Sequence, residues 1–150
     1  MPDSLGEQPK REQQTSPGET DWFLASLVDI VNRSNVELNV TLLVSGFLVS
    51  GTVVGGAKYF DGFASEFVSG LGDDAATPKI REWLSSHGEI YKPAQGADAD
   101  RLPEISYIHM KNARFFHSAG NPIPGNRGVW WRGRLAEVSG FMMGLLAREG

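Results

Sequence analysis

Two tryptophans and two arginines lie close together in the segment Gly128–Leu146, GVWWRGRLAEVSGFMMGLL. In a strand, successive side chains point to opposite faces of the sheet. One parity is apolar and is predicted to face the core: Val129, Trp131, Gly133 and Leu135. The other parity carries the charge: Trp130, Arg132 and Arg134. Trp and Arg often dominate protein interfaces, and an arginine can stack on an aromatic ring, so these three residues are candidate contact residues. The alternative is a solvated face on which the arginines form ordinary salt bridges.

A second group of candidates lies in residues 105–116, ISYIHMKNARFF, which are predicted to form a strand. Tyr107, His109 and Lys111 share one parity of that strand. We add them to the interaction candidates, as partly exposed strand residues.

Catalytic and metal-binding patterns are missing from the sequence. His87, His109 and His117 have no tight ligand spacing, and there is no cysteine, GxSxG, P-loop or strand-linked GxGxxG. Asp98 and Asp100 lie in a polar stretch that lacks the ligand pattern of an EF-hand, which favours a solvated loop over a calcium site. The sequence therefore marks no catalytic constellation, and an enzyme is the least favoured class of function.

Length and composition predict one domain without a membrane span. The chain has 150 residues, a net charge of −4 and a sequence pI near 5.3, which disfavours broad nonspecific binding to nucleic acid. No apolar run reaches about 18 residues, and the first twenty residues lack the apolar core of a secretory signal, so neither a membrane span nor a secretory signal is expected. Residues 1–19 are predicted to be a disordered polar tail, and residues 20–148 a single globular domain.

The elements that must position the candidates follow from hydrophobic periodicity. Thr20 is predicted to cap a helix with an apolar stripe at Leu24, Leu27, Val28 and Val31. From residue 36 the period changes to two, which predicts strands over about 36–44 and 47–54, with a bulge or bend at Gly51. An aromatic stripe over residues 58–68 predicts a helix that packs on the core or the sheet: Tyr59, Phe60, Phe63 and Phe67.

The second half of the chain is predicted to close the fold. Residues 69–104 form a variable helical or loop insertion, in which Thr77-Pro78 begins a short helix that buries Ile80, Trp83 and Leu84. The segment 128–146 is predicted to be a hairpin that turns at Ser139-Gly140. The fold class is α+β: an N-terminal helix with a strongly bent antiparallel sheet of about five strands, or a small Sm/SH3-like barrel, and a helical insertion between strands two and three.

Three blocks carry a resemblance to a known family: LNVTLLVSGFLVSGTVVGGAKYFDGF (38–63), SYIHMKNARFF (106–116) and WWRGRLAEVSGFMMGLL (130–146). With these blocks in the same order, the sequence resembles the gas vesicle accessory protein family GvpU. The resemblance implies a cytoplasmic, non-enzymatic protein without a cofactor. It would act in the assembly or clustering of gas vesicles, the air-filled protein shells that give cells buoyancy. Its partners would be the vesicle shell, other gas vesicle proteins or itself.

A competing interpretation is an Sm-like RNA-binding module, since a helix, bent strands and a late RGR segment are similar to that fold's pattern. The acidic charge balance disfavours it, because phosphate binding normally needs a concentrated basic surface. Self-association is expected in either case, because edge strands and bulky aromatic residues are hard to cover in a domain of this size.

Overall fold

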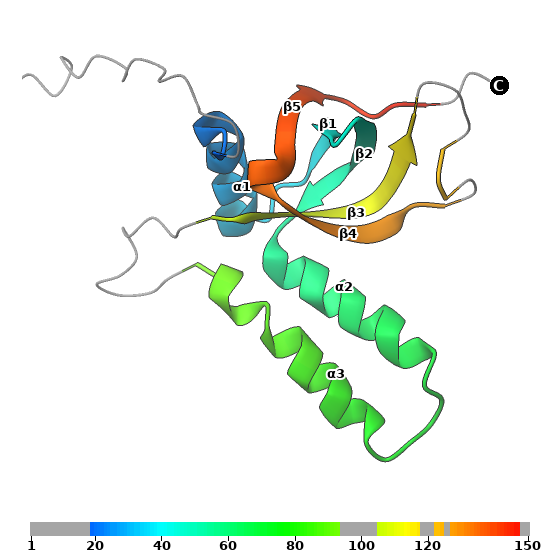
Figure 1. Cartoon of the computed structure of the whole chain (residues 1–150). Coiled ribbons are helices and arrows are strands. Elements are labelled where there is room, and N and C mark those ends of the chain that lie inside the picture. Colours follow the sequence, from blue (N-terminus) through cyan, green and yellow to red (C-terminus); the bar gives the residue numbers. More distant parts are fainter. Residues whose placement is uncertain (1–18, 94–104, 118–121, 125–126, 148–150) are drawn as a thin grey trace, which may run out of the picture.

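The structure is a computed structural model that describes residues 19–93, 105–117, 122–124 and 127–147 (Figure 1). The predicted tail, except residue 19, and the acidic loop at Asp98 and Asp100 lie outside these ranges. The elements in chain order are α1 (Trp22–Ser34), β1 (Leu38–Val44), β2 (Phe47–Val54), α2 (Gly56–Ser69), α3 (Thr77–Ser86), the 3-10 turn η1 (Glu89–Tyr91), β3 (Tyr107–Phe116), β4 (Val129–Arg134), the 3-10 turn η3 (Leu135–Glu137) and β5 (Val138–Met143).

The five strands form one antiparallel sheet in the order β4-β3-β2-β1-β5. The two outermost strands are consecutive in sequence and are joined only by the three-residue turn η3. A short connection can join opposite ends of a sheet only if the sheet curls strongly, as Figure 1 shows. The predicted α+β class, with an N-terminal helix and a helical insertion between strands two and three, is confirmed.

The predicted hairpin over 128–146 is wrong. β4 pairs with β3 and β5 pairs with β1, and the chain turns at Leu135–Glu137, before Ser139-Gly140. Leu135 is buried, and its N–H donates to the carbonyl oxygen of Ser106 at 2.9 Å. The two apolar strands look like a hairpin in the sequence because both contribute side chains to one core, but they do so from opposite ends of the sheet.

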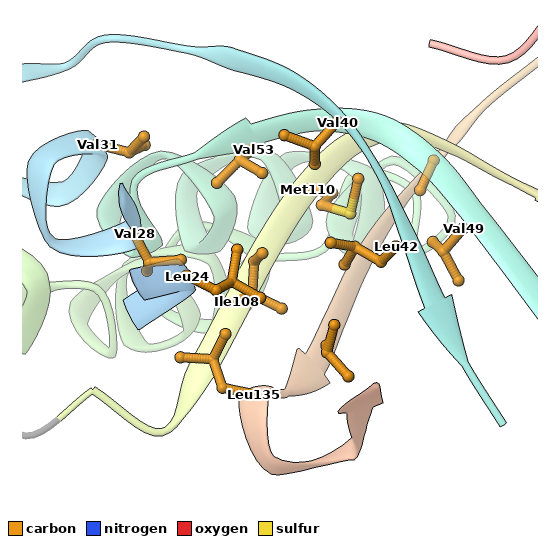
Figure 2. Packing of buried hydrophobic residues seen from close by; sticks show 12 residues of the cluster. Leu24, Val28, Val31, Val40, Leu42, Val49, Val53, Ile108, Met110 and Leu135 are labelled. Carbon is orange, nitrogen blue, oxygen red and sulfur yellow. The ribbon is translucent and has the colours of Figure 1, made fainter. Parts of the chain in front are cut away.

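The core lies between α1 and one face of the sheet (Figure 2). Leu24, Val28 and Val31 form the buried stripe of α1, and they pack against buried side chains of the strands and of η3, which include Val40, Leu42, Val49, Val53, Ile108, Met110 and Leu135. Each such side chain contributes roughly 1.5–3 kcal/mol when it is fully buried. The N-cap of α1 is Asp21, one residue after the predicted Thr20: its carboxylate accepts the N–H of Phe23 at 2.9 Å.

A bulge in β3 produces part of the bend. The register of β3 shifts by one residue against both β2 and β4, around Asn112, which has a left-handed backbone with φ of 54°. Gly51 lies opposite this bulge, and a Cβ there would come within 3.0 Å of the Ala113 backbone. The predicted irregularity at Gly51 is confirmed, but the extra residue belongs to β3.

α2 packs on the face of the sheet opposite to α1, and α2 and α3 form a helical hairpin that extends away from the sheet (Figure 1). The close approach of α3 to α2 requires Gly88, where a Cβ would lie 2.8 Å from Cα of Ala57. Ile80 and Leu84 are half-buried in this hairpin, as expected. Trp83 is 62% exposed, so its predicted burial is wrong; it packs edge-on against His87 at the outer side of α3.

Candidate functional site

The six predicted interaction residues lie on adjacent strands and share the face of the sheet opposite to the core. The register pairs Tyr107 with Arg134 and His109 with Arg132, whereas the alternate residues Ile108 and Met110 are in the core. The parity argument therefore places Tyr107, His109, Lys111, Trp130, Arg132 and Arg134 on one face. Their environments differ, because α2 covers part of that face.

Trp130 is covered by α2. A Cβ added at Gly62 would lie 2.0 Å from the Trp130 indole, so the indole lies against the helix backbone. The ring of Tyr59 meets the indole edge-on at 6.1 Å between centroids. Trp130 is half-buried and fixes α2 to β4.

His109 is enclosed by aromatic rings from α2 and η1. Its side chain is 1% exposed, and ring centroids lie at 4.8 Å for Tyr59, 4.9 Å for Tyr91 and 5.8 Å for Phe60. The expectation of a partly exposed histidine is wrong here, because a strand pattern does not show which face a helix will cover. Burial, and secondarily the Arg132 charge, lower the pKa of His109 from 6.5 to about 3. His109 is therefore neutral at physiological pH.

The two ring nitrogens of His109 have different surroundings. Nε2 accepts the Nε–H of Arg132 at 3.2 Å, so the proton of the neutral ring resides on Nδ1. Among the described residues, Nδ1 has no hydrogen-bond partner. Burial also raises the pKa of the neighbouring Tyr59, against the effect of Arg132. The buried side chains of His109 and Tyr59 are thus neutral, and the exposed guanidinium of Arg132 lies beside them.

Arg132 and Arg134 form the exposed part of the site. The guanidinium carbon of Arg132 lies 3.6 Å from the centroid of the Tyr107 ring, a close cation–π stack, and 5.8 Å from that of Phe60. The contacts with His109 and Tyr107 restrict the conformations of the Arg132 side chain, which lowers the entropy cost of any contact that it makes. Arg134 lies at the same exposed end of the β3–β4 pair.

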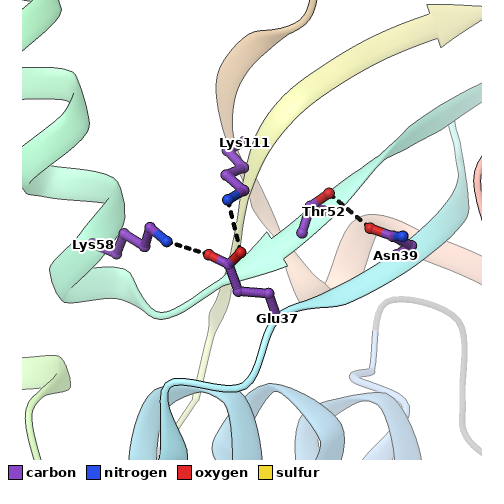
Figure 3. A network of polar contacts seen from close by, with 5 residues as sticks. All are labelled: Glu37, Asn39, Thr52, Lys58 and Lys111. Atoms are coloured by element: carbon purple, nitrogen blue, oxygen red, sulfur yellow. Dashed lines mark hydrogen bonds and ion pairs between the residues drawn. The ribbon is translucent and has the colours of Figure 1, made fainter.

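Lys111 is engaged in a charged network (Figure 3). Its Nζ lies 2.7 Å from Oε1 of Glu37, and Lys58 of α2 pairs with Oε2 of the same carboxylate. The hydrogen bonds from Lys111 and then from Lys58 lower the pKa of Glu37. This network connects the first turn of α2, the residue before β1 and the middle of β3, so Lys111 has a carboxylate partner, whereas no ion pair of Arg132 or Arg134 is found among the described residues.

Exposed aromatic and aliphatic side chains continue the site along the helical hairpin. Phe63 and Phe67 of α2 stack on each other at 6.2 Å, and Phe63 lies 5.9 Å from Tyr59, which meets Trp130. Both phenylalanines are exposed, so only the first part of the predicted aromatic stripe packs on the sheet. Tyr91, which helps to enclose His109, was not identified from the sequence. The sequence feature connected with it is the glycine at position 56, where a Cβ would overlap the Tyr91 ring.

The arrangement of these side chains is suited to non-covalent contacts with another molecule. In the described part of the chain, no three His, Asp or Glu side chains are grouped as metal ligands. The other histidines pack against aromatic rings, His87 against Trp83 and His117 against Phe47. No helix in the described ranges is long and apolar enough to span a bilayer.

A comparison with known protein families identifies the family of this chain. The family described as "Gas vesicle protein GvpU-like" matches residues 21–146. This chain belongs to the GvpU-like family. The match begins at the N-cap of α1 and ends three residues after β5, so the GvpU-like sequence pattern spans the whole described fold. The GvpU-like assignment confirms the resemblance and makes the protein gas vesicle-related. Searches of curated proteins and of solved structures gave no significant match.

Proposed function

We propose that this GvpU-like protein is a non-enzymatic, cytoplasmic accessory protein that acts in gas vesicle assembly or clustering. It binds the vesicle shell, other gas vesicle proteins or further copies of itself through a surface that we call the arginine–aromatic face. This face consists of Tyr107, Arg132, Arg134, Phe63 and Phe67. The observation that carries the proposal is the exposed guanidinium of Arg132, stacked on Tyr107 and held by His109.

The composition of the arginine–aromatic face suits protein binding. Arginine and aromatic residues are enriched at the centres of interfaces, where planar groups with little conformational freedom give large contact areas. Arg132 and Arg134 supply positive charge in a chain whose net charge is −4, so an acidic or carbonyl-rich surface is a suitable partner.

Modest contacts are sufficient for this role. A shell presents the same surface many times, and linked binding events gain effective concentration without new contacts. One exposed cation–π contact contributes roughly 0.5–1 kcal/mol, so two or three copies acting together change binding by about fivefold to somewhat over a hundredfold. Self-association supplies the linkage, and it can use the outer edges of β4 and β5, each of which is paired on one side only among the described residues.

The test uses purified gas vesicles and the full chain. Arg132→Gln with Arg134→Gln removes both charges, and Phe63→Ser with Phe67→Ser removes the aromatic part. Arg33→Gln on α1, at the opposite side of the sheet, makes the same type of substitution away from the face and is the control. We expect both double variants to reduce co-sedimentation with vesicles and vesicle clustering by light scattering, and the control to retain them. If both double variants bind and cluster vesicles like the wild type while remaining folded, the proposal is wrong.

The Sm-like RNA-binding alternative rests on the fold alone, and a fold does not confer a function. A gel shift with single-stranded RNA at low and moderate salt separates the two. Tight, salt-sensitive binding that Arg132→Gln and Arg134→Gln abolish would favour the alternative.

A further inference from the structure

A cavity of about 340 Å³ lies on the side of the sheet that carries the predicted contact residues, in the part that α2 leaves uncovered. Its lining includes Asn112 and Arg114 of β3, Arg127 just before β4, Ser50 and Thr52 of β2, and Leu145 after β5. None of these residues belongs to the arginine–aromatic face. We propose that this cavity binds a small phosphorylated molecule and that Arg114 and Arg127 hold its phosphate group.

The bulge in β3 shapes the cavity. Asn112 takes a left-handed backbone, and the chain before β4 lies directly on it, since a Cβ at Gly128 would come within 2.2 Å of the Asn112 carbonyl carbon. This contact brings Arg127, the residue before Gly128, to the wall that Asn112 forms. Beyond the bulge, Arg114 is paired in register with Ser50 of β2. Two arginines that are thirteen positions apart in sequence therefore line one cavity.

The segment after β5 closes another side. Thr41 Oγ1 lies 2.9 Å from the carbonyl oxygen of Gly144 and 3.1 Å from Ser50 Oγ, and the N–H of Leu146 donates to Ser50 Oγ at 2.8 Å. A carbonyl can only accept and a threonine has one hydroxyl proton, so Thr41 donates to Gly144 and Ser50 donates to Thr41. These bonds hold Leu145 at the cavity wall.

The hydroxyl protons of the wall are thus engaged. Ser50 donates to Thr41, and Thr52 donates to Oδ1 of Asn39 at 2.8 Å (Figure 3). The side-chain donors that remain for a ligand are the Asn112 amide and the two guanidinium groups. The two charged donors favour an anion.

Within the described part of the chain, neither guanidinium is neutralised by a carboxylate. Across the described residues, no carboxylate lies within salt-bridge distance of Arg114 or Arg127, whereas Glu37 pairs with both Lys58 and Lys111 nearby. Arg114 instead lies over the Phe116 ring at 5.8 Å. Two cations that line one cavity raise the local positive potential.

The charge and the volume together define the ligand class. A phosphate monoester carries about −1.5 to −2 charges at pH 7, which matches two guanidinium groups, and arginine binds phosphate oxygens with two parallel hydrogen bonds. A single carboxylate would balance only one of them. Small-molecule sites have volumes of roughly 300–1,000 Å³, so the cavity has room for an organic group beside the phosphate, with Leu145 as its apolar contact.

The test is isothermal calorimetry on the full chain with ribose 5-phosphate and adenosine monophosphate, beside their unphosphorylated counterparts, inorganic phosphate and citrate. We expect a phosphomonoester to bind, its unphosphorylated counterpart not to bind, and Arg127→Gln or Arg114→Gln to weaken binding by about tenfold or more, as the loss of a charge-assisted hydrogen bond predicts. Arg33→Gln is the matched control and should bind normally. Arg127 is exposed, so its replacement should leave the thermal midpoint unchanged even if Arg114→Gln lowers it.

Several results would overturn the proposal. These are the absence of phosphomonoester binding at millimolar concentration, binding that both arginine variants retain, citrate binding as tight as that of the phosphomonoesters, or inorganic phosphate binding as tight as that of either ester. Tighter binding of single-stranded RNA than of either monoester, with the same dependence on both arginines, would replace the small ligand by a nucleic acid. Vesicle co-sedimentation of Arg127→Gln is measured in parallel. The proposal for the phosphate site and the proposal for the arginine–aromatic face are therefore tested independently of each other.

Discussion

Arg132 of β4 donates its Nε–H to Nε2 of His109 on β3, across the strand pair, at 3.2 Å. This bond joins an exposed cation to a buried neutral ring. It fixes the tautomer of the histidine and orients the guanidinium over Tyr107, with the terminal amino groups left for a partner. The orientation of the exposed guanidinium thus depends on a buried side chain.

The first prediction concerns pH. Between about 3 and 6.5, the unfolded chain binds a proton at His109 and the folded chain does not, so stability is lost as the pH falls below 6.5. The loss is about 1.4 kcal/mol per pH unit, or about 2 kcal/mol at pH 5. Urea unfolding at pH 7.5 and 5 should show a smaller difference for His109→Phe than for wild type. His117→Gln, at the exposed end of β3, should keep the wild-type difference; equal differences in all three proteins would contradict the assignment.

The second prediction concerns the contact between Gly62 and Trp130. A methyl group at residue 62 would overlap the indole, so Gly62→Ala should destabilise the protein by about 1–3 kcal/mol, although alanine favours a helix over glycine. In Trp130→Ala the overlap disappears, and Gly62→Ala should then be neutral or stabilising. A double-mutant cycle by chemical denaturation measures this coupling. Additive effects would show that the indole does not pack on the helix backbone.

A third prediction follows from the burial of Leu135 in the turn that joins the two outer strands. Leu135→Ala should cost about 2–5 kcal/mol, because the cavity left between α1 and the sheet can collapse only partly. The exposed Leu71→Ala is the control and should change stability by less than about 0.5 kcal/mol. Thermal and urea unfolding of both variants give the comparison.

The fourth prediction concerns Ser50, which holds the segment after β5. Ser50→Ala leaves the Leu146 N–H and Thr41 Oγ1 without this partner and should cost about 1–3 kcal/mol. Hydrogen exchange at the Leu146 amide should become faster. Ser139→Ala removes an exposed hydroxyl that donates to the Leu43 carbonyl and should leave exchange at Leu146 unchanged.

The sequence alone was sufficient for the type and approximate span of most elements. A 3.6-residue apolar period gave α1, and alternation gave β1 and β2, because each of these elements buries one face against the same core. The same alternation grouped the six candidate residues into one parity on each of two strands, and the register of β3 with β4 places the two groups on one face. Gly51 marked the bend, because a close approach between strands excludes a Cβ.

Long-range packing decided the rest. Alternation shows that a strand has an apolar face, but it does not show which strand lies beside it. The sequence therefore predicts that β4 and β5 pair with each other, whereas in the structure β4 pairs with β3 and β5 pairs with β1. It also could not show that α2 covers His109 and Trp130 while Arg132 and Arg134 remain exposed.

The sequence by itself determined which residues share a face, since parity is a local property of an extended chain. Only the tertiary structure decided what those residues do, because burial depends on distant segments that cover them. The helix inserted between β2 and β3 made His109 a neutral support and Trp130 a packing contact. The bulge at Asn112 brought Arg114 and Arg127 to one cavity, which no spacing in the sequence indicates.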